Sequence, residues 1–217
     1  MPSDKDTIAR QIHIPAGRVR LEGELVLPAQ AAGVVAFAHG SGSSRHSPRN
    51  RYVASVLQAR GTGTLLFDLL TREEDLDYER RFDIALLTER LSQAADWLGN
   101  DPGTKDLAIG FFGASTGAAA ALQAAAAIGG PVKAVVSRGG RPDLAGTHAL
   151  RAVHAPTLLI VGGQDYGVIE LNEQAYAQLT CTKELKIIPG ATHLFEEPGT
   201  LEAAAQAAAD WFARYLV

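Results

Sequence analysis

The stretch GFFGASTGAAAAL (110–122) decides the fold. It joins a short apolar run, 107–113, to an alanine-rich stretch over 116–128 that consists of strong helix formers. At the junction stands Gly-Ala-Ser-Thr-Gly (113–117), a G-x-S-x-G pattern between an expected strand and an expected helix. In this context the pattern predicts a sharp strand-to-helix turn that displays the serine, with glycine on either side because larger side chains would clash.

Short apolar runs of the same kind recur along the chain and are typical of strands buried on both faces of a parallel sheet. They cover 33–40, 63–70, 107–113, 132–137, 157–163 and 184–190. Expected helices separate them, over 49–60, roughly 79–99, 116–128, 169–179 and 199–216. This alternation predicts an α/β fold with helices on both faces of the sheet. Two alternating segments, 11–15 and 19–28, come first and predict an antiparallel hairpin, which makes the sheet mixed rather than purely parallel.

Composition and charge exclude several classes of protein. The 217 residues predict a single domain over 1–217, and 20 Lys+Arg against 24 Asp+Glu give a net charge of −4, which offers no basic face for nucleic acid. Cys181 is the single cysteine, so neither an intrachain disulfide nor a cysteine-rich zinc cluster can form. No apolar run approaches the roughly 20 residues that span a bilayer, and the polar segment 1–11 lacks the apolar core of a secretory signal. We expect a cytoplasmic protein without a membrane partner.

Ligands bind open α/β sheets at the carboxyl ends of the strands. Ser115 follows the expected strand 107–113 at such an end, so it is the candidate nucleophile. One alternative is that Ser115 only caps the helix, but a cap does not require glycine on both sides. A second alternative is a dinucleotide loop, since Gly40-Ser41-Gly42 follows one expected strand and Asp68 ends the next. That fingerprint needs a third glycine where this chain has Arg45.

A serine nucleophile needs a base and a group that orients the base. On this kind of sheet the order along the chain is serine, acid, histidine. Asp165 and His193 each follow an expected strand, and His193 is the one histidine of six that lies after Asp165. The alternatives are that Asp165 caps the next helix and that His193 is incidental. Asp68 is the second candidate for the acid, although it precedes the serine.

The negative charge of an acyl-transfer intermediate needs preorganised N–H donors. We expect one donor to be the amide of Thr116, directly after the nucleophile, and the other to be the amide of Ser41. Gly40 and Gly42 would allow the unusual backbone of that loop. We interpret His39 as a residue that holds the loop rather than as a second base.

Four segments in chain order, AFAHGSG (36–42), GFFGASTG (110–117), APTLLIVGGQD (155–165) and PGATHLFEEPG (189–199), resemble the α/β-hydrolases of the dienelactone-hydrolase-like branch. The resemblance implies an α/β-hydrolase fold with Ser115 as nucleophile, Asp165 as acid and His193 as base. Dienelactone hydrolases proper carry a cysteine nucleophile, so the serine favours a general serine esterase over a lactone-specific enzyme.

Two further expectations concern the surroundings of the site. About nineteen residues (138–156) separate the strand that follows the serine turn from the next strand, which is too few for a large cap domain. This spacing predicts an open site for small to medium acyl groups. The charged segment 69–80 could form a partial flap, and a solvated loop is the favoured interpretation.

Arg138 and Arg141 follow a strand at the catalytic edge of the expected sheet. The resembled enzymes hold a substrate carboxylate with arginine, and a guanidinium suits a carboxylate well. The alternative, slightly favoured, is that Arg138 pairs with a local acid such as Asp143 or Glu170.

The sequence thus predicts a hydrolase that cleaves carboxylic esters, thioesters or lactones through an acyl-enzyme. We expect no cofactor and no metal, because the histidines lack the spacing of metal ligands. The expected partner is a small ester, and the sequence leaves a homodimer open. The competing hypothesis is a catalytically silent α/β-hydrolase fold that binds a ligand or a partner.

Overall fold

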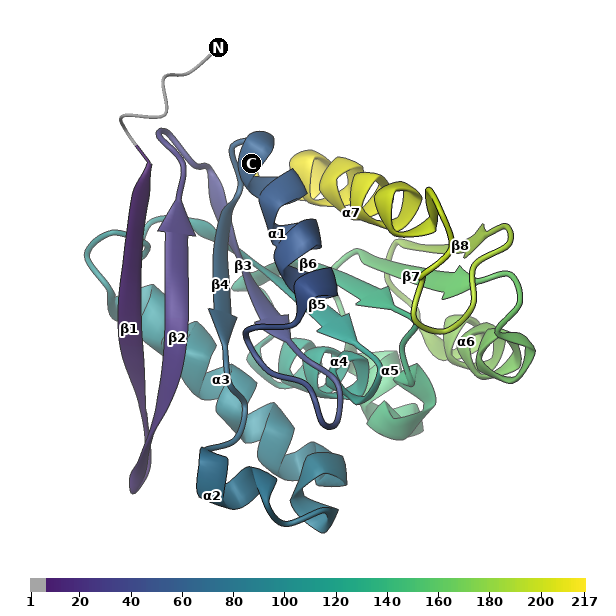
Figure 1. Ribbon diagram of the computed structural model, residues 1–217, viewed down its shortest axis with the longest axis horizontal. Coiled ribbons are helices and arrows are strands. Elements are labelled where there is room, and N and C mark those ends of the chain that lie inside the picture. Colours follow the sequence, from purple (N-terminus) through teal and green to yellow (C-terminus); the bar gives the residue numbers. More distant parts are fainter. Residues whose placement is uncertain (1–6) are drawn as a thin grey trace.

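The computed structural model describes residues 7–217; residues 1–6, at the start of the polar N-terminal segment, lie outside the described part. One eight-stranded sheet runs through the molecule in the order β1-β2-β4-β3-β5-β6-β7-β8 (Figure 1). The strands are β1 (Ile8–Ala16), β2 (Val19–Leu27), β3 (Gly33–Ala38), β4 (Gly63–Phe67), β5 (Ala108–Ala114), β6 (Val132–Arg138), β7 (Thr157–Gly162) and β8 (Lys183–Ile188). The predicted α/β fold is confirmed.

The sheet is mixed, as the sequence predicts. Strands β1 and β2 form an antiparallel hairpin, and β2 pairs antiparallel with β4. All the other neighbours, from β4 through β3 to β8, are parallel. The carboxyl ends of β3, β5, β6, β7 and β8 therefore lie along one edge of the sheet, where the loops that follow them meet.

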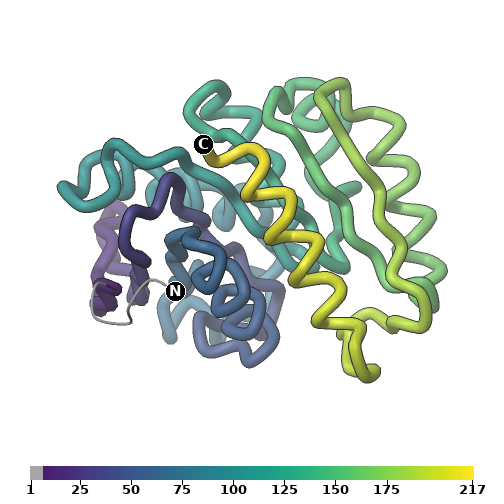
Figure 2. The backbone as a smooth tube through the Cα atoms, turned by 90° about the horizontal axis from the view of Figure 1, so that it is seen from above, coloured from purple at the N-terminus to yellow at the C-terminus, as the bar shows by residue number. Residues whose placement is uncertain are grey.

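Helices cover both faces of this sheet. They are α1 (Pro48–Ala59), α2 (Arg72–Asp75), α3 (Ile84–Asn100), α4 (Thr116–Ile128), α5 (Gly146–Ala152), α6 (Tyr166–Gln178) and α7 (Thr200–Tyr215), with two 3-10 turns, η2 (Glu79–Phe82) and η3 (Pro142–Ala145). Helices α1 and α7 pack side by side on one face, and α3, α4, α5 and α6 cover the other (Figures 1 and 2).

The side chains of the buried strands contribute to two hydrophobic cores, one on each face of the sheet. In β3, Val34 and Ala36 pack into the core under α3 and α4, whereas Val35 and Phe37 pack into the core under α1 and α7. Both sides of the strand are apolar for this reason, which produces the uninterrupted hydrophobic run. The small alanines of α4 are buried almost throughout the helix and let it lie close against the sheet.

Two helices differ from their expected extents. The stretch 79–99 is not one helix, because Asp83 ends the turn η2 and caps α3, its carboxylate accepting from the Leu86 N–H at 3.0 Å. Helix α6 starts at Tyr166, three residues earlier than expected and directly after Asp165. Between β6 and β7 the structure holds only η3 and α5, so the expected absence of a large cap is confirmed for residues 7–217.

The segment 69–80 is more ordered than a solvated loop. Helix α2 begins with a capping box between Thr71 and Glu74. Glu74 also accepts from the buried Arg90 at 3.0 Å, and Arg90 donates to the Ala16 carbonyl at 2.8 Å. These contacts fix the segment to α3 and to the end of β1. Within residues 7–217, each helix is too short or too polar to cross a lipid bilayer.

Candidate active site

Ser115 occupies a strained turn between β5 and α4. Its backbone has φ 52° and ψ −122°, a conformation that is rare for residues other than glycine. A Cβ at Gly117 would lie 2.1 Å from the Ala38 carbonyl oxygen, and one at Gly113 would lie 2.5 Å from the Ala118 Cα. Both glycines are therefore required by close backbone approach. Ser115 stands at the N-cap position of α4, yet its side chain makes no capping hydrogen bond.

The backbone after β6 supports this turn. The Ser115 N–H donates to the Arg138 carbonyl at 3.4 Å, and the Ser115 carbonyl accepts from the Arg141 N–H at 3.0 Å. A Cβ at Gly140 would lie 2.5 Å from the Ala118 Cβ, which no rotation can move away, so glycine fits best here as well. The segment Arg-Gly-Gly-Arg thus holds the serine in place through its main chain, a role that the sequence analysis did not anticipate.

Asp165 and His193 are brought together by the loops after β7 and β8. His193 Nδ1 lies 2.6 Å from Asp165 Oδ2. With the proton on Nδ1 donated to the carboxylate, the opposite nitrogen, Nε2, is left as an acceptor. Asp165 stands at the N-cap position of α6, but its carboxylate makes no capping hydrogen bond and contacts His193 instead. The buried Phe195, with φ 57°, anchors the histidine loop in the core.

A pocket of about 260 Å³ lies over Ser115 at this edge of the sheet. Its walls come from the loop after β3, the start of α1, the serine turn, the end of β6 and the histidine loop. The lining residues are Gly40, Ser41, Ser43, Ser47, Arg49, Asn50, Ala114, Ser115, Arg138, Gly139, His193 and Leu194. The pocket therefore joins the candidate nucleophile, the candidate base and one of the two candidate arginines.

The two candidate oxyanion donors lie beside each other. The Thr116 amide is the first of α4, and the first amides of a helix have no partner within it. The Ser41 amide donates to Thr116 Oγ1 at 3.0 Å. His39 is buried and uses both ring nitrogens, because Nδ1–H donates to the Gly40 carbonyl and Nε2 accepts from the Leu69 N–H, each at 3.0 Å. Burial lowers the pKa of His39, which suits a neutral, loop-holding residue.

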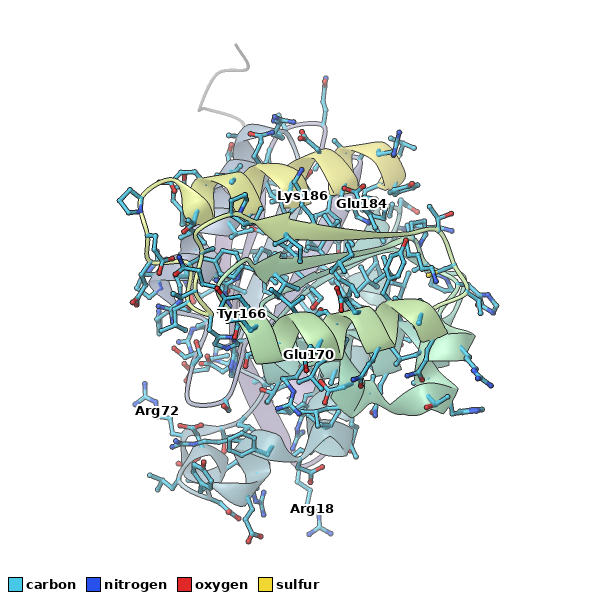
Figure 3. All side chains as sticks on the ribbon, turned by 90° about the vertical axis from the view of Figure 1, so that its right-hand side faces the viewer. Arg18, Arg72, Tyr166, Glu170, Glu184 and Lys186 are labelled. Atoms are coloured by element: carbon cyan, nitrogen blue, oxygen red, sulfur yellow. The ribbon has the colours of Figure 1, made fainter. Side chains whose placement is uncertain are left out.

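The two arginines of the sequence analysis have different surroundings. Arg141 donates to both carboxylate oxygens of Asp143, at 2.9 and 2.8 Å, which also raises the pKa of its guanidinium. Two of its donors are thus occupied by Asp143, and Arg141 is not among the residues that line the pocket over Ser115. Arg138 pairs with neither of the acids considered, since Asp143 is taken and Glu170 is exposed on α6 (Figure 3). The one hydrogen bond of its side chain runs from Nη2 to Asn50 Oδ1 at 3.3 Å.

Arg49 and Asn50 complete the pocket and were missed by the sequence analysis. Both belong to the first turn of α1, which begins after the N-cap Ser47. The available signal was a polar pair, Arg-Asn, directly after Ser-Pro (47–48) at a helix start near the carboxyl edge of the sheet.

Asp68, the second candidate for the acid, lies apart from this pocket. Its carboxylate accepts from the Arg45 N–H at 2.7 Å and forms an ion pair with the Arg45 guanidinium. Cys181 is also remote, in contact with Thr157, and burial raises the pKa of its thiol. Among residues 7–217, no three His, Cys, Asp or Glu side chains gather in a way that could hold a metal ion.

Comparisons with known proteins agree with this architecture. The sequence model of the dienelactone hydrolase family matches residues 22–216. Two relatives from strains of Mycobacterium tuberculosis, provisionally named phosphoribosyl transferases, are each 57% identical over 206 residues, which is 95% of this chain and 46% of theirs. This chain thus spans about half the length of those relatives.

Solved structures show the same fold. A dienelactone hydrolase from Anabaena variabilis is 58% identical, with a TM-score of 0.95 over 97% of this chain and 99% of its own. Est1E from Butyrivibrio proteoclasticus is 16% identical, with a TM-score of 0.80 over 94% of this chain and 98% of its own, a likeness in fold alone.

Proposed function

This chain belongs to the dienelactone hydrolase family, and we propose that it is a serine hydrolase acting on carboxylic esters, thioesters or lactones of small to medium acyl groups. The observation that carries the proposal is the 2.6 Å contact between His193 Nδ1 and Asp165 Oδ2. His193 lines the same pocket as Ser115. The histidine–carboxylate contact supports the proposal, because acyl transfer requires a nucleophile, a base and an acid that orients the base, and Ser115, His193 and Asp165 all follow strands at one edge of the sheet.

In the proposed reaction Ser115 Oγ attacks the acyl carbon while His193 Nε2 takes the serine proton. The carbon–oxygen or carbon–sulfur bond of the substrate then breaks, and His193 returns the proton to the leaving alcohol or thiol. Water repeats the sequence on the acyl-enzyme and releases the acid. Asp165 keeps the imidazole in the required tautomer and stabilises the imidazolium without taking the proton.

The amides of Thr116 and Ser41 are the proposed donors to the oxyanion. Removal of one such donor typically costs about 10²–10³ in kcat. The Thr116 amide opens helix α4, so the positive end of the helix dipole adds to its effect.

Two alternatives differ in class. A catalytically silent hydrolase fold would bind a ligand or partner without turnover, but it would not need Ser115 in a strained backbone conformation beside a histidine–carboxylate pair. Phosphoribosyl transfer is suggested by the names of the M. tuberculosis relatives, which are about twice as long as this chain. The serine turn favours acyl chemistry over transfer of a phosphoribosyl group.

Labelling with a fluorophosphonate probe, read by intact-mass spectrometry, tests the proposal. The wild-type protein should take up one probe molecule and Ser115→Ala none, whereas Ser43→Ala, which changes another serine of the pocket, should remain labelled. Hydrolysis of an ester, thioester and lactone panel should fall on the order of 10⁶-fold in Ser115→Ala. An unlabelled wild-type protein, or a Ser115→Ala variant with a tenth of the wild-type rate, would sink the proposal.

A further inference from the structure

The guanidinium of the buried Arg138 has no acidic partner among the described residues. Its exposed fraction is 6%, and Asn50 accepts its one hydrogen bond. Its Nε and Nη1 have no partner among the described residues. A buried charge is costly unless it is paired and hydrogen-bonded, and a guanidinium has five N–H groups to satisfy. Nε and Nη1 are covered by the surrounding protein, but Arg138 lines the pocket over Ser115, so an anion that enters the pocket meets the positive charge of this guanidinium.

A second guanidinium, that of Arg49, lines the same pocket. Its ion pair with Glu196 is loose, at 3.5 Å, and solvent-exposed, so it contributes little. Burial and then the charge of Arg49 lower the pKa of Arg138 to about 10, which leaves Arg138 positively charged near neutral pH. Among residues 7–217, no Asp or Glu lines the pocket. The pocket thus presents two positive charges, that of Arg138 without an acidic partner and that of Arg49 with a weak one.

We propose that this pocket binds a phosphate monoester group carried by the ester that Ser115 cleaves; the inference rests on the proposed hydrolase function. A phosphate dianion matches the two positive charges, and its three terminal oxygens can face both guanidinium groups at once. One guanidinium fork already satisfies the two oxygens of a carboxylate, so a carboxylate would leave Arg49 unused. The first turn of α1 faces the pocket with Asn50, and the positive end of that helix favours an anion as well.

The phosphate is recognised and not transferred. The bond that breaks is still the acyl carbon–oxygen bond, the alcohol leaves with the proton from His193, and the phosphate ester remains intact on the product.

Binding is tested on Ser115→Ala, which cannot turn over a substrate. Inorganic phosphate is titrated by calorimetry, with acetate as the carboxylate probe and potassium chloride to match the ionic strength. We expect phosphate to bind at least about tenfold more tightly than acetate. Adding Arg138→Gln should weaken phosphate binding about ten- to hundredfold, the effect of a lost charge-assisted hydrogen bond. Equal affinity for acetate, or unchanged affinity in the arginine variant, would overturn the inference.

The matched control lies on the same helix. Arg49→Gln should weaken phosphate binding several-fold, whereas Arg51→Gln, which changes an exposed arginine outside the pocket lining, should leave it unchanged. If Arg138→Gln does not fold, the contrast between the Arg49 and Arg51 variants decides the question, since both positions are solvent-accessible. Equal losses in the two would overturn the inference, because they would reflect general charge alone.

A kinetic comparison separates this inference from the proposed function. Wild-type protein is given three esters of one acyl group whose alcohol carries a phosphate, a carboxylate or a hydroxyl. We expect kcat/KM to be highest for the phosphate ester and this preference to fall ten- to hundredfold in Arg138→Gln. Hydrolysis of all three at similar rates would overturn the phosphate site while the hydrolase stands. Phosphate binding without cleavage of any ester would overturn the hydrolase proposal and with it the assigned substrate.

Discussion

Substituting Gly117 by alanine tests whether close packing at the serine turn sustains activity. The added Cβ would lie 2.1 Å from the Ala38 oxygen and 2.6 Å from the Ala38 carbonyl carbon, distances that real Cβ atoms essentially never show. Both neighbours are main chain, so no side chain can rotate away, and the start of α4 must move from β3 by about 1 Å. Overpacking costs about 1–3 kcal/mol or more, and a shift of about 1 Å can cost 10²-fold in rate.

The assay combines ester hydrolysis with urea unfolding. We expect Gly117→Ala to lose about 3 kcal/mol of unfolding free energy and about 10²-fold in kcat/KM. The control is Gly99→Ala within α3, where an added Cβ meets nothing within 4 Å. That variant should be about 0.5–1 kcal/mol more stable, because alanine is the better helix former, with unchanged activity. A Gly117→Ala protein with wild-type stability and activity would refute the packing argument.

Three other predictions address the acid, a buried histidine and a buried ion pair. Asp165→Asn should lower kcat by up to about 10⁴ in the ester assay, and Asp68→Asn should not; the reverse would reassign the acid. Burial lowers the folded-state pKa of His39, so its stabilisation is present above about pH 6.5 and is lost as pH falls towards that lowered value. The urea concentration at the midpoint of unfolding should therefore fall less on acidification in His39→Gln than in the wild-type protein. The same fall in both proteins would contradict this prediction. Glu74→Gln should cost about 3–5 kcal/mol in urea unfolding by leaving Arg90 uncompensated, and a loss below about 0.5 kcal/mol would contradict the pair.

Features that depend on local sterics or periodicity could be predicted from the sequence. The turn at Ser115 needs glycine at positions 113 and 117, and buried parallel strands need apolar residues on both sides. Asp165 and His193 follow strands whose carboxyl ends share an edge, so their proximity follows from the topology. Their side-by-side placement needed no knowledge of long-range packing beyond the order of the strands.

Features that depend on contacts between distant segments could not be predicted. Arg138 donates to Asn50, 88 residues away in the chain, and nothing near either residue encodes that meeting. The sequence alone suggests a nearby acid as the partner of Arg138. In the segment 69–80, most residues are solvent-exposed, as expected, but the contact of Glu74 with Arg90 on the next long helix could not be predicted for the same reason.

The hydrogen bond from the Ser41 amide to Thr116 Oγ1 bears on when the proposed oxyanion donor becomes engaged. A substrate carbonyl is a neutral acceptor, as the threonine hydroxyl is, and gains little by replacing it. An oxyanion accepts roughly twice as strongly, so it displaces the hydroxyl as charge develops. The donor would then discriminate against the ground state and stabilise the transition state selectively, which raises kcat without tightening substrate binding. Thr116→Val removes the competing acceptor at nearly constant volume, so the substrate carbonyl gains the Ser41 amide and KM should fall while kcat changes little; an unchanged KM would exclude this competition.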